Sequence, residues 1–361
     1  MKILIVKTNP FAPEGITGVV LNLYRTMDKT GMHIDAVAPG RTEKQYRDIF
    51  AQNGGKVYRI DRSLANPVGY VCKLKKCIQQ GGYDIVHIHG NSRTMALDLL
   101  AAKLAGCPVR IAHGHNSDCT YKWLHYLLTP LFRALCTQGF ACGEEAGKFL
   151  FGKAPFTVIP NGIPIKKYAF HSAKRQQLRQ QLGLEGKTVL CNVGRLSPVK
   201  NHSFLLRVLK TLTEKRQDLH LLLIGDGELR QALEEQGKDL PVTFVGLTDQ
   251  VTDYLNISDV FVLPSLYEGF PLSAMEAQAN GLPCLLSDTV TRGVDISGSS
   301  VYLPLEEAAW VDALLALDWQ SGRSRRSFEN QEALQAQGYD NESIGAYLKR
   351  CYEQTQKGMG E

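Results

Sequence analysis

The sequence contains no apolar run near the roughly 20 residues that a membrane-spanning helix needs. Its nine cysteines form no Cys-x-x-Cys pair and have no regular spacing, so neither a zinc ribbon nor a disulfide framework is indicated. We therefore expect reduced thiols in a cytosolic protein. A Gly-x-Gly-x-x-Gly run is also missing, which excludes the Rossmann dinucleotide fingerprint. The chain has no Asp-x-Asp element either, so one common kind of magnesium site is absent.

Length and charge indicate two domains and an anionic partner. A chain of 361 residues is too long for one compact core. Residues 1–165 hold 20 Lys and Arg against 11 Asp and Glu, whereas residues 166–361 hold 21 against 25. A basic first half suits an anionic surface or ligand. No nucleic-acid module is recognisable, so we do not expect nucleic acid as the partner. We expect the anionic partner to be the inner face of a membrane or a phosphate-linked acceptor. A solvated basic surface without a partner is the alternative.

Short apolar segments alternate with helical patterns in both halves, which predicts an α/β fold with mostly parallel sheets. Met1-Lys2 leads directly into ILIV, which is typical of a first strand and not of a signal peptide. The segment TVIPNGIPIKKYAF interrupts the rhythm with two prolines and an Asn-Gly, and we interpret it as a connection between domains. The expected domains are 1–165 and 166–340, each doubly wound, with a ligand cleft between them and an amphipathic helix at 341–356.

Two glutamates, Glu268 and Glu276, stand at the end of a predicted buried strand, DVFVLP, and on the helix after it. Pro271 suits a first helical position, and Gly281 suits the end of that helix. Ligands of open α/β sheets bind at the carboxyl ends of strands. Two carboxylates there suit an extended polar ligand such as a nucleotide sugar.

Arg195 and Lys200, in GRLSPVKNH, follow the first strand of the second half, where a planar guanidinium and an ammonium can share a diphosphate. Two solvated surface cations are the alternative. The Gly225-Asp-Gly227 turn leaves room for a ligand, although a plain turn needs none. Gly15 and Gly18 can form a loop whose amides point towards phosphate or sugar.

The histidines come in two pairs, His87 with His89 and His113 with His115, and residues two apart on a strand share a face. No carboxylate or thiolate completes a metal ligand set, so we expect no metal and interpret these residues as polar groups of a cleft wall. The segment from Thr120 to Leu135 mixes aromatic, basic and apolar residues. We favour ordinary packing for it, with a membrane interface as the alternative.

With these motifs in order, the chain resembles the retaining glycosyltransferases of family 4, which have the GT-B fold of two Rossmann-like domains, and within them the bacterial capsular and exopolysaccharide enzymes. The resemblance covers essentially the whole chain. It rests on GR-x4-K, LLLIGDGEL, VGLTDQV, DVFVLPS and E-x7-E between Gly194 and Asp288, and on DIVHIHG, IAHGHNS and VIPNGI earlier.

The resemblance implies a role for each matching residue. Arg195 and Lys200 would bind the donor diphosphate, Glu276 the ribose, and Glu268 with His115 the transferred sugar. The catalytic set would be Arg195, Lys200, Glu268 and His115. The other donor-binding positions would be Gly15, Gly194, Gly225, Gly246, Leu247, Gly269, Phe270, Pro271 and Leu272, with the base against residues 246–250 and the closing helix packed on the first domain.

Two positions depart from the family pattern. The first loop has Glu14-Gly15-Ile16-Thr17 in place of Gly-Gly followed by an acidic residue, which bears on how the acceptor is held. Pro164 replaces the acidic residue that usually follows Asn-Gly-Ile, which bears on the hinge.

The function implied is transfer of a hexosyl unit, without a metal or other cofactor, from a UDP-sugar to a saccharide or lipid-linked acceptor. It would take place in the cytoplasm at the inner face of the plasma membrane. A GT-B-type nucleotide-sugar epimerase and a catalytically silent nucleotide-sugar or saccharide-binding protein are the alternatives. A sugar phosphorylase is disfavoured, because no pyridoxal-lysine context is apparent and the chain is short.

Overall fold

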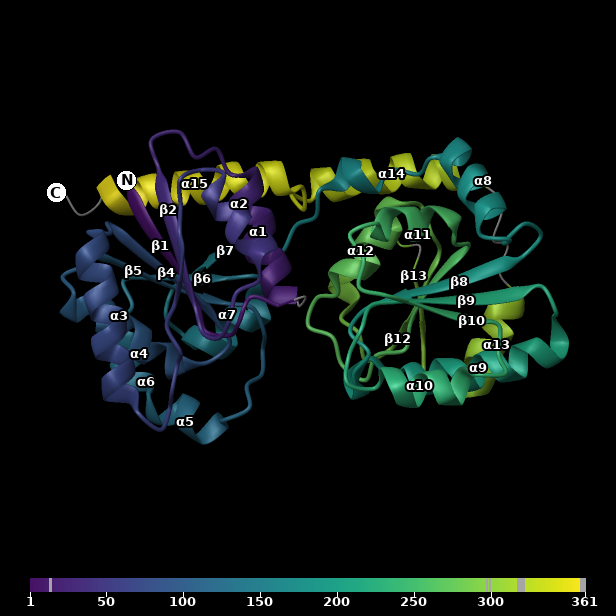
Figure 1. Cartoon of the computed structure of the whole chain (residues 1–361), viewed down its shortest axis with the longest axis horizontal. Helices are drawn as coiled ribbons and strands as arrows, with labels where there is room; N and C mark the ends of the chain where they lie inside the picture. The colour runs from purple at the N-terminus through teal and green to yellow at the C-terminus, as the bar shows by residue number, and fades with distance from the viewer. Residues whose placement is uncertain (13–14, 297, 299, 317–321, 358–361) are drawn as a thin grey trace. The chain divides into compact units, whose positions relative to one another are not determined.

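The computed structural model describes residues 1–12, 15–296, 298, 300–316 and 322–357 (Figure 1). The chain divides into two compact units, one formed by residues 1–162 with residues 341–361 and the other by residues 163–340. We call them the first and the second unit. Each is described by itself.

The first unit is built on a parallel sheet in the order β3-β2-β1-β4-β5-β6-β7. Its strands are β1 (Lys2–Lys7), β2 (His33–Ala38), β3 (Val57–Arg59), β4 (Ile85–Gly90), β5 (Val109–Gly114), β6 (Gln138–Ala141) and β7 (Thr157–Val158). Its helices are α1 (Gly15–Thr26), α2 (Lys44–Ala51), α3 (Pro67–Gly81), η1 (Arg93–Met95), α4 (Ala96–Leu104), α5 (Lys122–Leu127), α6 (Thr129–Leu135), α7 (Glu144–Phe151) and α15 (Asn341–Lys357).

Helices cover both faces of this sheet, and β1, β4 and β5 are accordingly buried on both sides. Leu4, Val86 and Ala112 point to the face covered by α3, α4, α6 and α7. His87 points to the other face, where its ring meets Tyr352 of α15. Helix α15, drawn in yellow, runs along α1 (Figure 1).

The second unit repeats this architecture with the sheet order β10-β9-β8-β11-β12-β13, again parallel. Its strands are β8 (Thr188–Val193), β9 (Leu219–Ile224), β10 (Val242–Gly246), β11 (Val260–Leu263), β12 (Cys284–Ser287) and β13 (Ser300–Leu303). Its helices are η2 (Ile165–Tyr168), α8 (Ser172–Gln181), η3 (Pro198–Lys200), α9 (His202–Lys215), α10 (Arg230–Gly237), α11 (Val251–Ile257), α12 (Leu272–Ala279), η4 (Arg292–Val294), α13 (Glu307–Ala316) and α14 (Arg323–Ala336).

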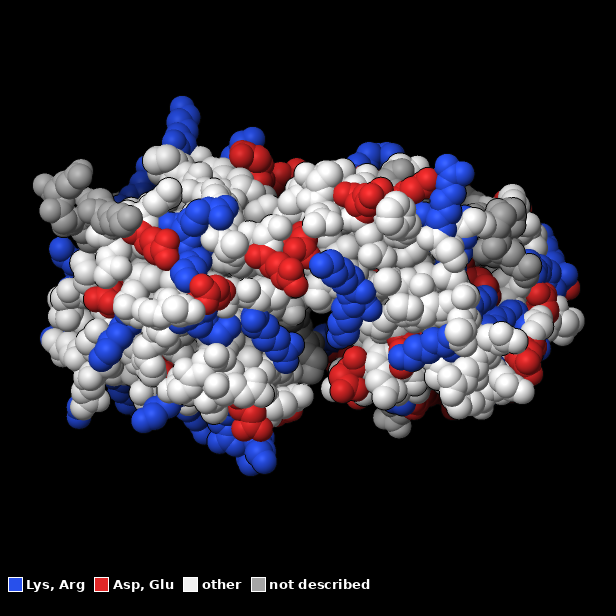
Figure 2. Space-filling view, turned by 90° about the horizontal axis from the view of Figure 1, so that it is seen from above, with Lys and Arg blue, Asp and Glu red and all other residues white. Residues whose placement is uncertain are grey.

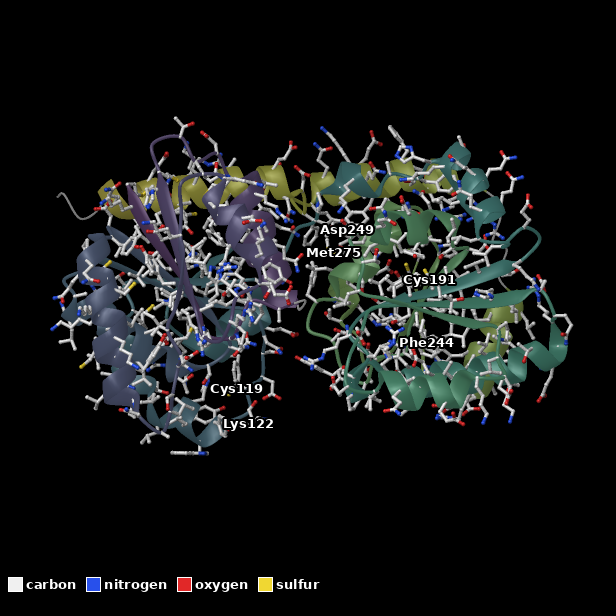
Figure 3. The ribbon with its side chains drawn as sticks, in the orientation of Figure 1. Cys119, Lys122, Cys191, Phe244, Asp249 and Met275 are labelled. Carbon is white, nitrogen blue, oxygen red and sulfur yellow. The ribbon has the colours of Figure 1, made fainter. Side chains whose placement is uncertain are left out.

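Two hydrophobic clusters fill the second unit, one on each face of its sheet. Cys191 of β8 and Met275 of α12 belong to the cluster under α11 and α12, and both side chains lie inside the unit (Figure 3). Leu190 and Leu223 belong to the opposite cluster, under α9 and α13. The prediction of doubly wound α/β units is therefore confirmed. Among the described residues no helix is long and apolar enough to cross a membrane.

One sequence interpretation needs correction. The segment from Thr157 was interpreted entirely as a connection, but its first two residues form the edge strand β7, which pairs with β6. A two-residue strand cannot be recognised from periodicity, because its pattern is too short.

Candidate functional site

In the sheet of the second unit, β8 and β11 lie side by side. From β8 the sheet continues through β9 and β10 in one direction, and from β11 it continues through β12 and β13 in the other, so the strand order reverses between β8 and β11. Open α/β sheets bind ligands in the crevice outside the carboxyl ends of strands at such a switch point. Lys200 lies shortly after β8, and Glu268 lies shortly after β11. Asn192 ties these two strands together, since its Nδ2 donates to the Val262 carbonyl at 2.7 Å. The switch point thus brings together residues that are far apart in the sequence.

Lys200 and Glu268 form an ion pair at this point. The Ser265 hydroxyl donates to the same carboxylate oxygen of Glu268 at 2.7 Å. The two charged side chains are only 19% and 13% exposed, so water screens them less than it would a surface pair. The backbone joins the two loops as well, because the Leu266 N–H donates to the Val199 carbonyl at 2.8 Å.

Arg195 lies beside Lys200 in the chain but is far more exposed. Its Nε donates to Glu228 at 3.0 Å, across the loop that follows β9. The two cations of the GR-x4-K motif are therefore each neutralised by a carboxylate from a neighbouring strand end. A negatively charged ligand can replace such a carboxylate.

Glycine allows the loops after β8 and β9 to touch. Gly225 has a φ of +135°, and a Cβ on it would lie 2.0 Å from the Gly194 carbonyl oxygen. Its N–H donates to the Gly246 carbonyl at 3.0 Å, so the ends of β8, β9 and β10 converge. Leu247 follows Gly246 with a largely exposed side chain. The predicted positions Gly194, Gly225, Gly246 and Leu247 thus share one edge of the sheet.

Glu276 lies in α12, and its carboxylate accepts a hydrogen bond of 2.8 Å from the Tyr168 hydroxyl. Burial raises the pKa of Glu276 to about 7, although the hydrogen bond from Tyr168 and the nearby charge of Lys167 act in the opposite direction. The side chain is therefore near the midpoint of its titration at neutral pH, unlike an exposed glutamate.

Four predicted positions form the loop and first turn before Glu276: Gly269, Phe270, Pro271 and Leu272. Pro271 caps α12, which begins at Leu272, one residue later than expected. The Phe270 ring stacks on Tyr339 with centroids 5.5 Å apart. An anion near this helix start would be stabilised by the helix dipole.

The remaining predicted residues, Gly15 and His115, belong to the first unit. Gly15 is the first residue of α1, and His115 directly follows β5. His115 Nε2 lies 2.9 Å from His89 Nδ1. Burial, followed by the charge of Lys7, lowers the pKa of His115 to about 3, so this imidazole is neutral at physiological pH.

His87 and His89 of β4, His113 of β5 and His115 directly after β5 form one cluster with Tyr352. His87 Nδ1 lies 2.6 Å from the Tyr352 hydroxyl, and His87 Nε2 lies 3.1 Å from His113 Nδ1. Burial and the neighbouring imidazoles also hold the pKa values of His89 and His113 well below the usual range. Ligating atoms of His87, His89 and His113 lie within 4.8 Å of one another, but the rings are already paired among themselves. The absence of a metal stays a prediction.

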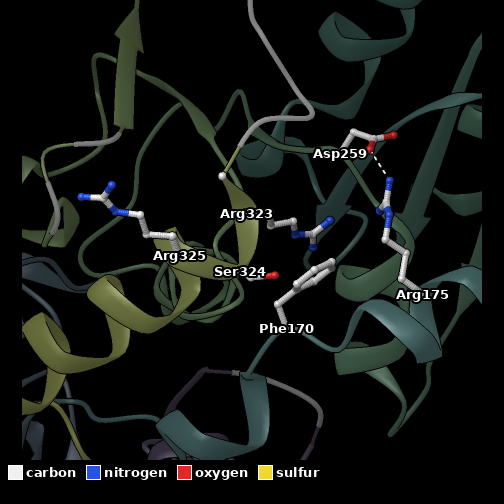
Figure 4. Close-up of a pocket in the computed structure, with 7 residues that line it drawn as sticks. Phe170, Arg175, Asp259, Arg323, Ser324 and Arg325 are labelled. Carbon is white, nitrogen blue, oxygen red and sulfur yellow. Dashed lines mark hydrogen bonds and ion pairs between the residues drawn. The ribbon is translucent and has the colours of Figure 1, made fainter.

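A pocket of about 590 Å³ opens elsewhere in the second unit (Figure 4). Asp259, which lines it, directly precedes β11, so the pocket lies at the amino edge of the sheet and not at the switch point. Two of the arginines that line this pocket already bind groups of the protein. Arg175 pairs with Asp259, and Arg323 donates to the carbonyls of Leu255 and Ser258. We interpret this pocket as structural.

Sequence reasoning missed three partners of the predicted residues: Tyr168, Ser265 and Glu228. Tyr168 lies in the segment interpreted as a linker, 108 residues before Glu276. Such a contact has no local signal. Ser265 and Glu228 lie within the recognised motifs DVFVLPS and LLLIGDGEL, so a search of those motifs for further polar residues could have found them.

Comparison with known proteins matches both units. Residues 13–167 fit the family described as Glycosyltransferase Family 4, and residues 174–296 fit Glycosyl transferases group 1. EpsF of Bacillus subtilis (strain 168), provisionally named a glycosyltransferase, is 33% identical to this chain. The match covers 95% of this chain and 94% of EpsF. An Escherichia coli enzyme named UDP-Gal:alpha-D-GlcNAc-diphosphoundecaprenol alpha-1,3-galactosyltransferase is 34% identical over 63% of each chain.

The fold has solved counterparts. The crystal structure of HepE from Anabaena in complex with UDP superposes with a TM-score of 0.78 at 18% identity, covering 98% of this chain and 100% of that one. At this identity the likeness supports the fold alone, and it confirms the GT-B prediction. Because the EpsF match spans nearly both full chains and both family matches fall in the predicted order, the chain belongs to the family 4 glycosyltransferases and is similar to their exopolysaccharide members.

Proposed function

We propose that the protein transfers a hexosyl unit from a UDP-sugar to a hydroxyl group of a lipid-linked saccharide during the synthesis of surface polysaccharide, with retention at the anomeric carbon. The nucleotide is supported by the donor named for the Escherichia coli relative and by the UDP bound to HepE. The acceptor class is supported by the diphosphoundecaprenol in that relative's name.

The observation that carries the proposal is the switch-point ion pair between Lys200 and Glu268. When a donor diphosphate enters, it takes the place of the Glu268 carboxylate on Lys200 and of Glu228 on Arg195. Glu268 is then released to contact hydroxyl groups of the transferred sugar. One exchange of partners thus prepares both the phosphate contact and the sugar contact.

The other predicted residues hold the rest of the donor. Glu276 accepts hydrogen bonds from the ribose hydroxyls and is oriented by Tyr168. The loop at Gly269 and Phe270, just before α12, faces the phosphate, and the converging ends of β8, β9 and β10 leave the space beside Leu247 for the base. His115 of the first unit contacts the sugar as a neutral imidazole.

In the reaction, the bond from the anomeric carbon to the phosphate oxygen breaks while the acceptor oxygen bonds to the same face of that carbon. The proton of the acceptor hydroxyl passes to the departing phosphate oxygen. Negative charge grows on the diphosphate as the bond breaks, so fixed cations at Lys200 and Arg195 stabilise the transition state more than the bound substrate. These cations supply the role that a metal fills elsewhere, and we propose that no metal is required.

The first test is a thermal-shift panel of UDP, GDP, ADP and their sugars, with and without EDTA, followed by transfer assays on lipid-linked acceptors. UDP compounds should raise the unfolding midpoint by mass action, and EDTA should change neither this shift nor the transfer rate. Lys200→Ala should bind UDP roughly 10- to 100-fold more weakly, because it loses a charged contact. Lys210→Ala, an exposed lysine on α9, is the matched control and should bind as the wild type does.

Three other results would redirect the proposal. Isomerised donor or free sugar formed without an acceptor would indicate an epimerase. Donor bound and left intact with every acceptor would indicate a binding protein. Stabilisation by GDP compounds instead of UDP compounds would contradict the proposed donor.

A further inference from the structure

Helices α5 and α6 expose a stripe of large apolar side chains. Only Leu128 separates the two helices, and the chain stays helical enough there for its N–H to donate to the Leu124 carbonyl at 3.1 Å. Along this segment the exposed positions recur at helical spacing. They are Lys122, Trp123, Tyr126, Leu127, Pro130, Arg133 and Ala134, with Tyr121 just before them.

The exposure of these side chains is large: 68% for Trp123, 62% for Tyr126 and 65% for Leu127. The opposite side of the same segment already packs on the first unit, where Phe132 and Leu135 are buried. A surface helix of a globular protein normally turns polar residues outwards. This segment is apolar on both sides, so packing on its own unit explains only the inner side.

The charge around the stripe is mainly positive. No Asp or Glu occurs between Asp118 and Glu144, whereas Lys122 and Arg133 both lie within the segment and are exposed. Asp118, just before the segment, pairs with Lys122 at 3.2 Å, so Arg133 and this exposed pair are what the lipid phosphates would meet. On the face drawn in Figure 2, by contrast, acidic side chains are interspersed among the basic ones of the first unit. Lys122 extends from the outer edge of this unit (Figure 3). The surface therefore combines exposed aromatic rings with cations, which complements an anionic lipid surface and not a basic or neutral one.

The segment is also fastened firmly to its unit. Arg93 is buried, and its guanidinium donates to the carbonyls of Leu150 and Phe149 and to the Thr129 hydroxyl at 2.8, 3.2 and 2.7 Å. Its guanidinium carbon also lies 5.9 Å from the centre of the Tyr126 ring. The exposed aromatic side chains are therefore carried by a fixed support, which reduces the entropy lost on docking.

We propose that the exposed face of residues 121–134 docks the protein on an anionic bilayer, with Trp123, Tyr126 and Leu127 entering the headgroup region and Lys122 and Arg133 facing lipid phosphates. This inference rests on the proposed function, because a lipid-linked acceptor places the reaction at a membrane. It goes further by assigning the contact to one segment of the first unit.

The test is sedimentation of the full chain with vesicles of phosphatidylcholine alone and of phosphatidylcholine mixed with phosphatidylglycerol. We expect binding to the anionic vesicles. Trp123→Ala combined with Leu127→Ala should weaken it by about tenfold or more. Lys122→Gln and Arg133→Gln should each weaken it by about fivefold and reduce the preference for anionic lipid. Phe328→Ala is the matched control, because Phe328 is equally exposed (63%) but lies on α14 of the second unit.

A second measurement reports whether the Trp123 ring enters the bilayer. Brominated lipid should quench the tryptophan fluorescence of Trp319→Phe more strongly than that of Trp319→Phe combined with Trp123→Phe, since the one tryptophan left in the latter, Trp310, is buried in the protein. Vesicle binding that is unchanged in the Trp123/Leu127 variant would overturn the assignment. So would a loss of self-association in that variant without any vesicle binding, which would mean that a second copy covers this face.

The two proposals can fail separately. If UDP stabilises the protein and transfer to a detergent-dispersed acceptor proceeds, but no vesicle is bound, the docking surface is wrong and the proposed function stands. If UDP has no effect while the vesicles bind, the reverse holds.

Discussion

Glu276 differs from an exposed glutamate because the folded protein prefers its neutral form. Its pKa in the folded state is about 7, against 4.5 for the free side chain. A group whose pKa rises on folding adds stability at pH values below its unfolded pKa, and that stability is lost as the pH rises through the folded value. The second unit should therefore lose stability between about pH 4.5 and pH 7.

The Glu276→Gln variant should remove this part of the pH dependence, which amounts to up to about 3 kcal/mol. Urea unfolding across that pH range measures it, with Glu332→Gln, an exposed glutamate on α14, as the control that keeps the wild-type slope. An unchanged slope in Glu276→Gln would mean that the carboxylate is better solvated than its surroundings indicate.

At the scale of single residues, the sequence predicts chemistry better than contacts. Arg195, Lys200, Glu268 and Glu276 could be chosen because strand ends and motif spacing are local. The pairing of Lys200 with Glu268 could not be predicted, since it joins positions 68 apart through the strand order of the sheet. The Tyr168 contact that orients Glu276 lies outside every recognised motif.

Among the elements, β4, β5 and α15 are held together by the histidine cluster that includes Tyr352. The stability that this cluster contributes depends on the histidines staying neutral, so it is sensitive to acid. Burial, followed by the charge of His115, lowers the pKa of His87 from 6.5 to about 3. A base with a lowered pKa contributes stability above its unfolded pKa, which is lost as the pH falls towards the folded value. The first unit should therefore weaken from about pH 6.5 downwards.

Tyr352→Phe should destabilise the first unit by about 1–3 kcal/mol at neutral pH, because a buried nitrogen of His87 loses its hydrogen-bond partner. Thermal unfolding measures this, and Tyr121→Phe, whose ring is exposed, should leave the midpoint in place. Equal midpoints for Tyr352→Phe and the wild type would contradict the role of this hydrogen bond.

The contact of α15 with α1 depends on a glycine. A Cβ on Gly345 would lie 2.9 Å from the Met27 backbone nitrogen and 3.0 Å from its Cα, so backbone would have to move. Gly345→Ala should lower the stability of the first unit by about 1–3 kcal/mol in denaturant titrations. Gly18→Ala, in helix α1 with nothing within 4 Å, should instead raise it by about 1 kcal/mol. The same sign for both variants would refute the close approach.

Elements with strong apolar periodicity could be predicted from the sequence, and weakly patterned ones could not. Strands such as β8 and β9 are buried on both faces and appear as continuous apolar runs. Strand β13 and helix α14 were not predicted, because β13 is partly exposed and α14 is mostly polar. The segment from Thr120 to Leu135 was expected to pack ordinarily. Its inner side does so, but its outer side is exposed, and the order of residues alone does not distinguish the two.

For the whole molecule, the important feature is that the first unit is assembled from both ends of the chain. Ending the chain at Asp340 removes α15, its contact with α1 and the Tyr352 partner of His87. The truncated protein should unfold in two steps, with only the first unit destabilised. Calorimetry with and without UDP measures the midpoint temperature of each unfolding step. The step whose midpoint UDP raises should have the same midpoint temperature in the truncated and the full chain. If that step falls equally, the second unit also depends on α15.

The position of α15 in the gene also fixes an order of events during synthesis. The ribosome makes residues 1–162 first, but the helix that covers His87 and α1 leaves it only after the whole second unit. The second unit can fold on the nascent chain, whereas the first must wait with α1 and the part of its sheet around His87 uncovered. A product that stops short of α15 therefore exposes the groups that α15 covers, and quality-control proteases can recognise such an incomplete product by them.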